Sequence, residues 1–430
     1  MHSPAANNAT VLSFEDARRA VEDHAANMST PEAESCELLQ AAGRVLAESI
    51  LADRDLPPFP RSTRDGYAVR SADLARVPAR LEVIGEIKAG EALDRIPANI
   101  GAGQTASIMT GAPVPTGADA VVMVEFTSEE SGRVEITRSV AQGENIVPRG
   151  AEARAGSVLV DRGDRLNEAT IALAASVGKS SLKVYKRPRV AVLTTGDEII
   201  DVEAIPGPTQ IRNSNSYSLA VQIRNAGGVP VLLPTAPDEA KRLRALIEEG
   251  LTHDLLLLTG GVSMGRYDLV EQVLTDLQAE FFFTGAKIQP GRPVVFGKCG
   301  ADTPFDKLRA GPARETVGVY FFGLPGNPVS TMVTFELFAR PMLEALAGMS
   351  PNKLKFVYAK LKSEIRTKTG LKRFLPAILS GEFDDAEVEL VSWQGSGDVA
   401  ATARANCYIV IPPDRERIAE GEFVAVMLRG

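Results

Sequence analysis

The chain has 430 residues, which at ordinary domain sizes predicts about three domains. Hydrophobic residues make up 44% of it and charged residues 24%, a globular composition that excludes a disordered, collagen-like or coiled-coil chain. The formal net charge of −8 argues against general binding of nucleic acid, which depends on basic residues that neutralise phosphates. An anionic ligand would therefore need helix N-termini and individually placed arginine or lysine residues.

Several classes of site and location are also disfavoured. No stretch approaches the ~18 uninterrupted apolar residues of a membrane-spanning helix, and the first residues lack the basic-then-apolar order of a signal peptide. Cys36, Cys299 and Cys407 are too far apart for a disulfide framework or a zinc-binding pair, which favours a reducing cytoplasm. The histidines are equally dispersed, which argues against a zinc site or a Ser-His-Asp hydrolase. We expect a cytoplasmic protein with no nucleic-acid or membrane partner.

The N-terminal part predicts two helices and then a break. Ser13 and Asp16 have the spacing of a reciprocal helix cap and open a helix expected over 14–28. A second, short helix is expected over 34–42. The proline-rich run 55–60 interrupts regular structure, because proline lacks a backbone donor and restricts the residue before it. We place a domain boundary there.

Residues 67–140 are expected to form strands and turns without a strong helix. The segment 81–87 partly alternates between polar and apolar residues, and 120–126 is an apolar run typical of a buried strand. This pattern predicts a β-rich inserted domain. A mixed connecting region, 141–184, follows it.

Strands and helices alternate between residues 187 and 347, which predicts a parallel sheet with right-handed crossovers. Strands are expected over 190–195, 229–233 and 255–259, and helices over 213–225, from the N-cap Asp238 to 249, and over 268–277. Such sheets bind ligands at the carboxyl ends of their strands. After about residue 350 the pattern returns to strands and predicts a small closing β-domain, with strands over 355–361, 388–391, 407–411 and 422–428. The polar tract 302–315 predicts an exposed hairpin loop.

Three strand ends in the predicted parallel domain carry unusual loops. They are Thr194-Thr195-Gly196-Asp197-Glu198, Thr259-Gly260-Gly261-Val262-Ser263-Met264-Gly265 with Asp268, and Gly323-Leu324-Pro325-Gly326-Asn327-Pro328-Val329-Ser330 with an amphipathic helix over 331–345. Glycine allows tight turns and lets backbone N–H groups approach a phosphate. Alone, each loop is more typical of a turn, and an Asp at a helix start is more typical of an N-cap. Together, on one sheet edge, they favour a site whose carboxylates suit a hard cation such as Mg²⁺.

Six segments, in the same order, closely resemble those of the molybdopterin molybdotransferase (MoeA) family, which includes the E domain of gephyrin. They are Asp65-Gly66-Tyr67-Ala68, Met109-Thr110-Gly111-Ala112-Pro113-Val114-Pro115, the three strand-end loops above, and Gln394-Gly395-Ser396 with Asn406-Cys407. The resemblance covers about residues 12–428. One motif alone would be weak evidence, but six in order are specific.

The resemblance implies an α/β multidomain fold and a homodimer whose active site is shared between subunits. The implied domains are an elongated linking domain (30–56 and 141–185), a β-rich inserted domain (57–140), a parallel α/β molybdopterin-binding domain (12–29 and 186–348) and a C-terminal β-barrel domain (351–430). Implied partners are the molybdopterin adenylyltransferase and proteins that mature molybdoenzymes.

The implied reaction is the Mg²⁺-dependent insertion of molybdate into adenylylated molybdopterin, which releases AMP and molybdenum cofactor. The implied catalytic residues are Asp65, Glu198 and Asp268, and the implied metal ligands are Asp197, Glu198 and Asp268. The residues implied to bind the pterin substrate are Thr110, Gly260, Gly261, Ser263, Pro325, Asn327 and Pro328. Those implied to bind molybdate are Gln289, Arg292, Arg373 and Ser396.

Some positions depart from the family pattern. Gln289 occupies a place often held by lysine, which keeps a donor but removes a charge, while Arg292 retains the second basic position. Lys287 is a candidate to compensate, because residues two apart on a strand share a face, although an ordinary solvated lysine is an equal alternative. Arg149-Gly150-Ala151-Glu152 keeps one carboxylate where some relatives have two. The 302–315 tract matches nothing in the family pattern.

Two other functions remain open from the sequence. One is the adenylylation of molybdopterin, because the α/β domain resembles that of adenylyltransferases; the additional β-domains argue against it. The other is a non-enzymatic scaffold, as the resemblance to gephyrin allows, although scaffolding there depends on additional domains. An assay with ATP and no molybdate separates the two enzymes, since an adenylyltransferase would consume ATP.

Overall fold

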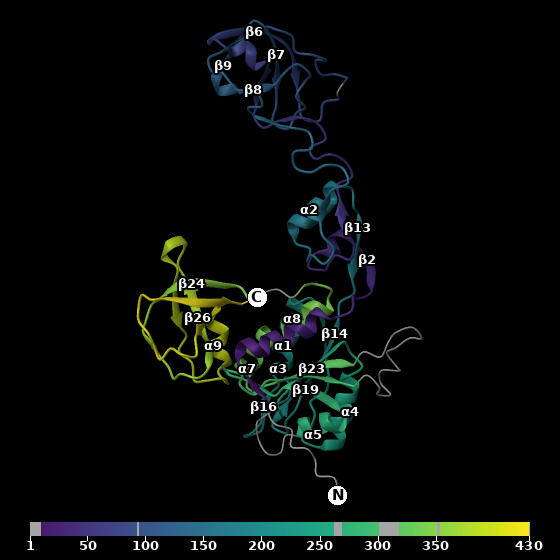
Figure 1. Cartoon of the computed structure of the whole chain (residues 1–430), viewed down its shortest axis with the longest axis vertical. Helices are drawn as coiled ribbons and strands as arrows, with labels where there is room; N and C mark the ends of the chain where they lie inside the picture. The colour runs from purple at the N-terminus through teal and green to yellow at the C-terminus, as the bar shows by residue number, and fades with distance from the viewer. Residues whose placement is uncertain (1–9, 93, 262–268, 301–317, 351–352, 430) are drawn as a thin grey trace. The chain divides into compact units, whose positions relative to one another are not determined.

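The computed structural model describes residues 10–92, 94–261, 269–300, 318–350 and 353–429. Contacts divide the chain into two compact units: Met1–Ser35, Gly43–Ala47 and Lys183–Gly430 form the first, and Cys36–Ala42 and Glu48–Leu182 form the second. Figure 1 traces the chain from purple to yellow through their elements. The finer division into four domains stays a prediction. Within the described ranges, no helix has the length and apolar character needed to cross a membrane.

The second unit contains a six-stranded sheet with the order β8-β5-β7-β6-β10-β9. Its strands are β5 (Gly66–Val69), β6 (Ala79–Ile87), β7 (Gln104–Ile108), β8 (Ala120–Met123), β9 (Thr127–Glu130) and β10 (Arg133–Ile136). Two apolar clusters fill the unit, one containing Tyr67 and Val122 and the other Ala68 and Ile108. The β-rich character predicted for this region is therefore present, and both predicted strands begin within two residues of their expected positions.

Gly66 is required by the packing of this sheet. A Cβ atom there would lie 1.8 Å from the carbonyl oxygen of Val122 on β8, so the backbone of one or both strands would have to shift. Gly66→Ala should therefore break the β5–β8 pairing and lower the melting temperature of this unit by several degrees, about 5 °C or more. The matched control is Gly101→Ala, whose new methyl group meets only the flexible Gln104 side chain. Equal melting curves for both variants, measured by circular dichroism, would contradict this role of Gly66.

The remainder of the second unit is a set of short pairings and one helix. They are β3 (Ile50–Leu51) with β12 (Val158–Val160), β4 (Arg61–Ser62) with β11 (Ile146–Val147), and helix α2 (Glu168–Ser176). The helix predicted over 34–42 is wrong. Residues Ala33–Glu37 form the strand β2. A short 3₁₀ helix follows, over Leu38–Ala41. Ser35 and Cys36 are weak helix formers, and the segment lacks a repeating apolar face.

The first unit is built on a six-stranded sheet with the order β17-β14-β18-β23-β22-β19. The strands are β14 (Arg189–Thr194), β17 (Val229–Leu232), β18 (Leu255–Thr259), β19 (Ala279–Phe283), β22 (Val295–Cys299) and β23 (Val319–Leu324). The first four in this order are parallel, as predicted, whereas β22 and β19 add an antiparallel edge. The 302–315 tract predicted as a hairpin loop lies outside the described residues, between β22 and β23.

Helices cover the faces of this sheet. They are α1 (Phe14–Ala26), α3 (Asn215–Asn225), α4 (Ala240–Gly250), α5 (Leu269–Asp276), and α7 (Pro328–Thr334) continuing through a π turn (Phe335–Ala339) into α8 (Arg340–Leu346). The predicted cap of α1 is confirmed, because the Ser13 hydroxyl accepts a hydrogen bond from the backbone N–H of Asp16 at 3.0 Å. Helix α4 instead begins at Ala240 with no side-chain cap, so the predicted N-cap role of Asp238 is wrong.

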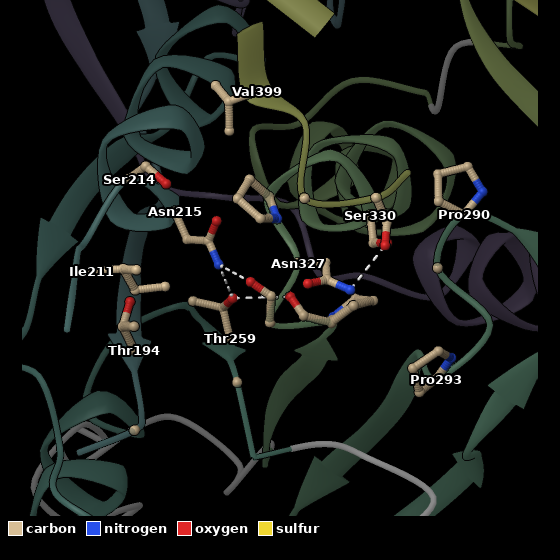
Figure 2. A pocket seen from close by; sticks show the side chains of 18 of the residues that line it. Thr194, Ile211, Ser214, Asn215, Thr259, Pro290, Pro293, Asn327, Ser330 and Val399 are labelled. Carbon is tan, nitrogen blue, oxygen red and sulfur yellow. Dashed lines mark hydrogen bonds between the residues drawn. The ribbon is translucent and has the colours of Figure 1, made fainter. Parts of the chain in front are cut away.

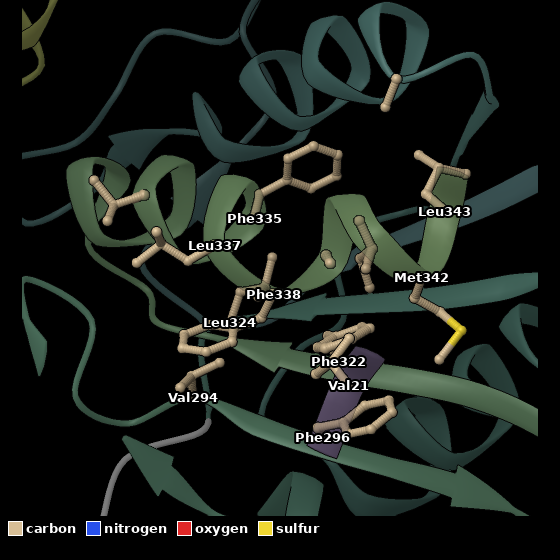
Figure 3. Packing of buried hydrophobic residues seen from close by; sticks show 14 of the residues in the cluster. Val21, Val294, Phe296, Phe322, Leu324, Phe335, Leu337, Phe338, Met342 and Leu343 are labelled. Carbon is tan, nitrogen blue, oxygen red and sulfur yellow. The ribbon is translucent and has the colours of Figure 1, made fainter. Parts of the chain in front are cut away.

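The helical segment after β23 is buried on nearly all sides. Figure 3 shows Phe338 and Met342 directed toward Phe296 and Phe322 of the sheet, whereas Phe335 lies on the opposite side of the helix; all of them belong to one buried cluster. Residues 331–345 are helical, as predicted. The prediction that this helix is amphipathic is wrong, because it has no exposed face. The sequence alone could not distinguish an amphipathic helix from a fully buried one, because α1, which is distant in sequence, covers the side that would otherwise face water.

The C-terminal part of the first unit is a closed five-stranded barrel. Its strands are β24 (Phe356–Leu361), β26 (Lys372–Ser380), β27 (Glu387–Leu390), β28 (Cys407–Ile411) and β30 (Phe423–Leu428). The ladder runs β26-β27-β24-β30-β28 and closes through β28–β26. The long strand β26 was not among the predicted strands, since Pro376 interrupts its pattern. A short strand, β21 (Ile288–Gln289), pairs with the start of β26 and so joins the α/β part to the barrel.

Candidate active site

The first unit contains a cavity of about 1070 Å³ at the carboxyl edge of the parallel strands. Described residues of all three predicted loops line it, after β14, β18 and β23, and the second loop is described only as far as Gly261. Barrel residues complete the wall, because the loop Gly395–Gly397 lies against the start of α7. There the backbone N–H of Val329 donates to the carbonyl of Ser396 at 3.0 Å. The prediction that the three loops meet at one edge is confirmed.

Glycines hold the three loops close together. Gly260 has a φ of 87°, and a Cβ atom on it would lie 2.6 Å from the carbonyl oxygen of Thr195. Gly326 packs on Gly260, with 3.5 Å between its would-be Cβ and the Gly260 Cα. Any side chain at Gly260 would therefore separate the first loop from the second. The loops form one continuous floor.

A hydrogen-bond network fixes this floor beneath the cavity. Asn215, at the start of α3, donates from Nδ2 to the Thr259 hydroxyl at 2.9 Å and to the Gly326 carbonyl at 2.7 Å. Thr259 in turn donates to the carbonyl of Pro325 at 3.1 Å. Figure 2 shows Asn215 and Thr259 joined in this way, next to Asn327. Because both acceptors of Asn215 are oxygens, the orientation of its amide is determined.

The first loop carries an acidic group at the cavity wall. Glu198 lines the cavity, and Gly196 has a φ of 133° with a would-be Cβ only 2.6 Å from Glu198 Oε2. Asp238 lines the same cavity, and its backbone N–H donates to Asp197 Oδ1 at 3.0 Å. Partial burial, then the neighbouring carboxylates of Asp197 and Glu198, raise the pKa of Asp238 above its ordinary value. Negative charge is therefore concentrated at the end of the cavity where Glu198 and Asp238 lie.

These carboxylates bear on the predicted cation. Across the ranges that the structure describes, no three His, Cys, Asp or Glu side chains form a ready-made metal cluster. Mg²⁺ commonly uses one or two carboxylates and completes its shell with waters and substrate phosphates. Glu198 and Asp238 fit that donor set, whereas Asp197 is not among the residues that line the cavity. Asp268 and Ser263, also predicted here, lie outside the described residues.

The residues predicted to bind molybdate divide into two groups. Gln289, Arg292 and Ser396 line the cavity. Arg373 does not: it pairs in register with Gln289, its side chain is buried, and its guanidinium donates to the Leu371 carbonyl at 3.1 Å. Burial lowers the pKa of Arg373. Lys287 is exposed and is not a lining residue, so the cavity does not support its compensating role.

Asn327 and Ser396 were predicted to bind different substrates, but the structure joins them. The Asn327 amide Nδ2 donates to the Ser396 hydroxyl at 2.8 Å. The predicted residues Gly260, Gly261, Pro325 and Pro328 also line the cavity. The amide of Asn327 therefore connects the floor to the barrel loop and orients the Ser396 oxygen.

The barrel loop that carries Ser396 is itself held by Asp398. Its carboxylate accepts from the backbone N–H of Ala401 at 2.9 Å, where it caps helix α9 (Val399–Arg404), and from that of Gln394 at 3.1 Å. These backbone donors hold the pKa of Asp398 below its usual value. Ionised Asp398 therefore closes the loop around Ser396.

Asp398→Ala should lower the melting temperature at pH 7 by a few degrees, about 2–4 °C. A carboxyl with a lowered pKa contributes stability above its unfolded pKa of ~3.9, and this contribution is lost as the pH falls through the folded value. The difference from the native protein, measured by scanning calorimetry, should therefore become smaller as the pH is lowered below the unfolded pKa of ~3.9. A difference that is constant across this range would contradict the role of the charge. Asp384→Ala, an exposed acid in the same barrel, is the control.

Asp65 and Thr110 belong to the second unit and lie together there. The carboxylate of Asp65 accepts from the Thr110 backbone N–H at 2.6 Å, and this bond is the main cause of its lowered pKa. Both residues are exposed. The structure thus brings this predicted pair together within one unit, and their action in a shared site stays a prediction.

Several cavity residues were not predicted from the sequence, and three of them, Asp238, Arg212 and Trp393, carry chemistry that bears on a ligand. Asp238 was interpreted as a helix cap, although its place after the parallel strand β17 was a usable signal. Arg212 ends the short strand β16 (Ile211–Arg212), is exposed, and donates from Nε to the Ala204 carbonyl at 3.0 Å. Trp393 follows β27, and no local motif marks it. Among the lining residues that the structure describes, Arg212 and Arg292 are the cations.

Comparison with known proteins agrees with this arrangement. Residues 12–178 match the model of the MoeA N-terminal region (domain I and II), 191–345 that of the "Probable molybdopterin binding domain", and 358–428 that of the MoeA C-terminal region (domain IV). Molybdopterin molybdenumtransferase from Bacillus subtilis is 33% identical over 412 residues, covering 92% of this chain and 90% of that protein. The relative of the same name from Nostoc is 33% identical over 407 residues, covering 93% and 89%.

Solved structures give the same result. A molybdopterin biosynthesis MoeA protein from Pyrococcus horikoshii matches with 32% identity and a TM-score of 0.69, covering 98% of this chain and 100% of that one. A second structure of that name from strain OT3 matches with 27% identity and a TM-score of 0.75, covering 97% and 100%. The chain belongs to the MoeA family of molybdopterin molybdenumtransferases.

Proposed function

We propose that this protein inserts molybdate into adenylylated molybdopterin in an Mg²⁺-dependent reaction that releases AMP and molybdenum cofactor. One observation carries the proposal: a single cavity has two carboxylates, Glu198 and Asp238, together with the oxyanion donors Arg292 and Ser396. Its volume of about 1070 Å³ suits a ligand as large as a pterin joined to a nucleotide. The names of the relatives support the same reaction class.

Glu198 and Asp238 would hold Mg²⁺ beside the phosphates, and Asp268 is a further predicted ligand. When bound, the ion neutralises negative charge as the phosphate bond to AMP breaks. Arg212 supports this interpretation, because its Nε is already bonded to the Ala204 carbonyl and its remaining N–H groups are available to a phosphate oxygen. The acidic and basic groups therefore suit an anionic ligand that arrives with a divalent cation.

Arg292, Gln289 and Ser396 would bind molybdate. A tetrahedral oxyanion needs several convergent donors, and a guanidinium supplies a fixed fork of them. The bond from Asn327 leaves the Ser396 hydroxyl hydrogen free to donate to that anion, because the Ser396 oxygen is the acceptor. The cavity thus offers donors of three chemical types.

The proposal is tested by AMP release in an omission series. Purified protein with adenylylated molybdopterin, molybdate and Mg²⁺ should release AMP, and omission of any one component should abolish the release. Release without molybdate would contradict the insertase. The adenylyltransferase alternative predicts instead that ATP is consumed with molybdopterin alone, and the scaffold alternative predicts no turnover in either assay.

We also propose that the working site is shared within a homodimer, with Asp65 and Thr110 of one subunit acting at the cavity of the other. Asp65→Asn and Glu198→Gln homodimers should each be nearly inactive. After complete subunit exchange of an equimolar mixture, total activity should rise to about a quarter of the native value, because about half of the dimers are heterodimers and one of the two sites in each carries neither change. Measured AMP release that stays at the homodimer level after subunit exchange, verified by mass spectrometry, would contradict sharing.

In the cell, this function requires a supplier and a recipient. An adenylyltransferase would supply the activated pterin, and proteins that mature molybdoenzymes would receive the cofactor. We infer a cytoplasmic location for these exchanges.

A further inference from the structure

Trp393 is the single tryptophan of the chain, and it lines the cavity. It is half-buried between β27 and α9. Part of its indole packs against the α/β core, against the barrel core and against a small cluster of Val391, Ala401 and Ala405. Contact with three clusters restrains the ring, so its remaining surface forms a fixed wall of the cavity.

The position of Trp393 along the barrel places it near the molybdate-binding end. Beyond β27 the chain continues antiparallel to β26, with the backbone N–H of Val391 donating to the Pro376 carbonyl at 3.0 Å. This course leads Trp393 toward the start of β26, where Arg373 pairs with Gln289. Three residues later the same loop carries Ser396. The indole therefore belongs to the wall that also presents Gln289 and Ser396.

The charges at this wall differ from those at the other end of the lining. Glu198 and Asp238 follow β14 and β17, Arg212 ends β16, and together they suit phosphates with a cation. Trp393, Ile288, Leu371 and Val399 are apolar and cannot bind a phosphate. Ile199 and Ile211 are apolar at the other end, but among the described lining residues the aromatic side chain is that of Trp393. A flat heterocycle gains most from such a surface, since aromatic side chains bind fused rings by stacking.

We propose that Trp393 is the residue against which the pterin half of the substrate stacks, which holds the pterin beside molybdate. This assignment rests on the proposed function. The substrate carries two fused-ring heterocycles, pterin and adenine, with the same stacking chemistry. Molybdenum is joined to the pterin half, so the heterocycle beside Gln289 and Ser396 is the pterin.

The test is equilibrium binding of each half separately. In the native protein, molybdopterin should change the emission of Trp393, whereas AMP should leave it unchanged. Trp393→Leu keeps an apolar side chain but loses the flat face, so calorimetry should show molybdopterin binding weakened by ~10-fold and AMP binding within about twofold of native. Trp393→Phe retains a ring and should restore most of the affinity. A merely structural tryptophan would not produce this difference between ligands.

Phe383→Leu is the matched control, because Phe383 is an aromatic of the barrel that is 95% exposed and does not line the cavity. Melting curves establish that each variant is folded. Native affinity for molybdopterin in Trp393→Leu, or a larger loss for AMP than for molybdopterin, would overturn the assignment. If the native protein turns over substrate, either result leaves the proposed function intact. Failure of the native protein to bind either half would overturn both.

Discussion

Glu198→Gln should reduce AMP release by ~100-fold at low Mg²⁺ and leave the fold intact. The amide has the shape of the carboxylate but not its charge, so the cation would be held by Asp238 and its remaining partners only. Because the substitution weakens Mg²⁺ binding, part of the activity should return as the Mg²⁺ concentration is raised. The measurement is the initial rate of AMP release against Mg²⁺ concentration at saturating pterin and molybdate.

The control for this variant is Glu239→Gln, which removes the same charge next to Asp238 in the chain. Glu239 is exposed and does not line the cavity, so its loss should leave the Mg²⁺ dependence unchanged. Equal Mg²⁺ curves for native protein and Glu198→Gln would exclude Glu198 as a ligand.

Arg292→Ala should raise the concentration of molybdate needed for half-maximal AMP release by ~10- to 100-fold. A charge-assisted hydrogen bond contributes about 1.5–3 kcal/mol, which corresponds to that factor. Binding of the adenylylated pterin, followed by calorimetry, should change less. Arg242→Ala removes an exposed cation from α4, outside the cavity lining, and is the matched control.

Two further variants distinguish residues that contact molybdate from residues that only stabilise the wall of the molybdate site. Gln289→Lys restores a charge at a residue that lines the cavity and should lower the molybdate requirement. Arg373→Ala should act mainly through stability, because its buried guanidinium holds the Leu371 carbonyl behind the wall. Identical molybdate dependence in native protein, Arg292→Ala and Gln289→Lys would refute the proposed anion site.

The regular elements were predictable wherever local chemistry determines them. The Ser13 cap begins α1 in the structure, and the apolar runs that became β14 and β18 are buried as expected for parallel strands. Failures occurred where tertiary contacts override local pattern. Strand β26 persists through Pro376 because barrel neighbours on both sides support it, and the helix after β23 loses its polar face because α1 covers it.

The candidate site was predictable to the extent that glycines and strand ends mark it. Gly260 and Glu198 could be selected because a positive φ and a rim carboxylate follow from their positions after strands. Trp393 and Arg212 could not be selected, because they reach the cavity only through the closure of the barrel and the β15 (Ile199–Ile200) to β16 pairing. Arg373 was assigned from the family pattern, which does not report that its side chain is buried, and its role in binding molybdate stays a prediction.

The most direct test of molybdenum insertion is the stoichiometry of a single turnover. Excess protein is mixed with limiting adenylylated molybdopterin, molybdate and Mg²⁺, and the quenched reaction is analysed for AMP and for molybdenum bound to the pterin. The account predicts one molybdenum incorporated per AMP released, at equal rates. AMP released without molybdenum in the pterin product, or molybdenum incorporated without AMP, would contradict it.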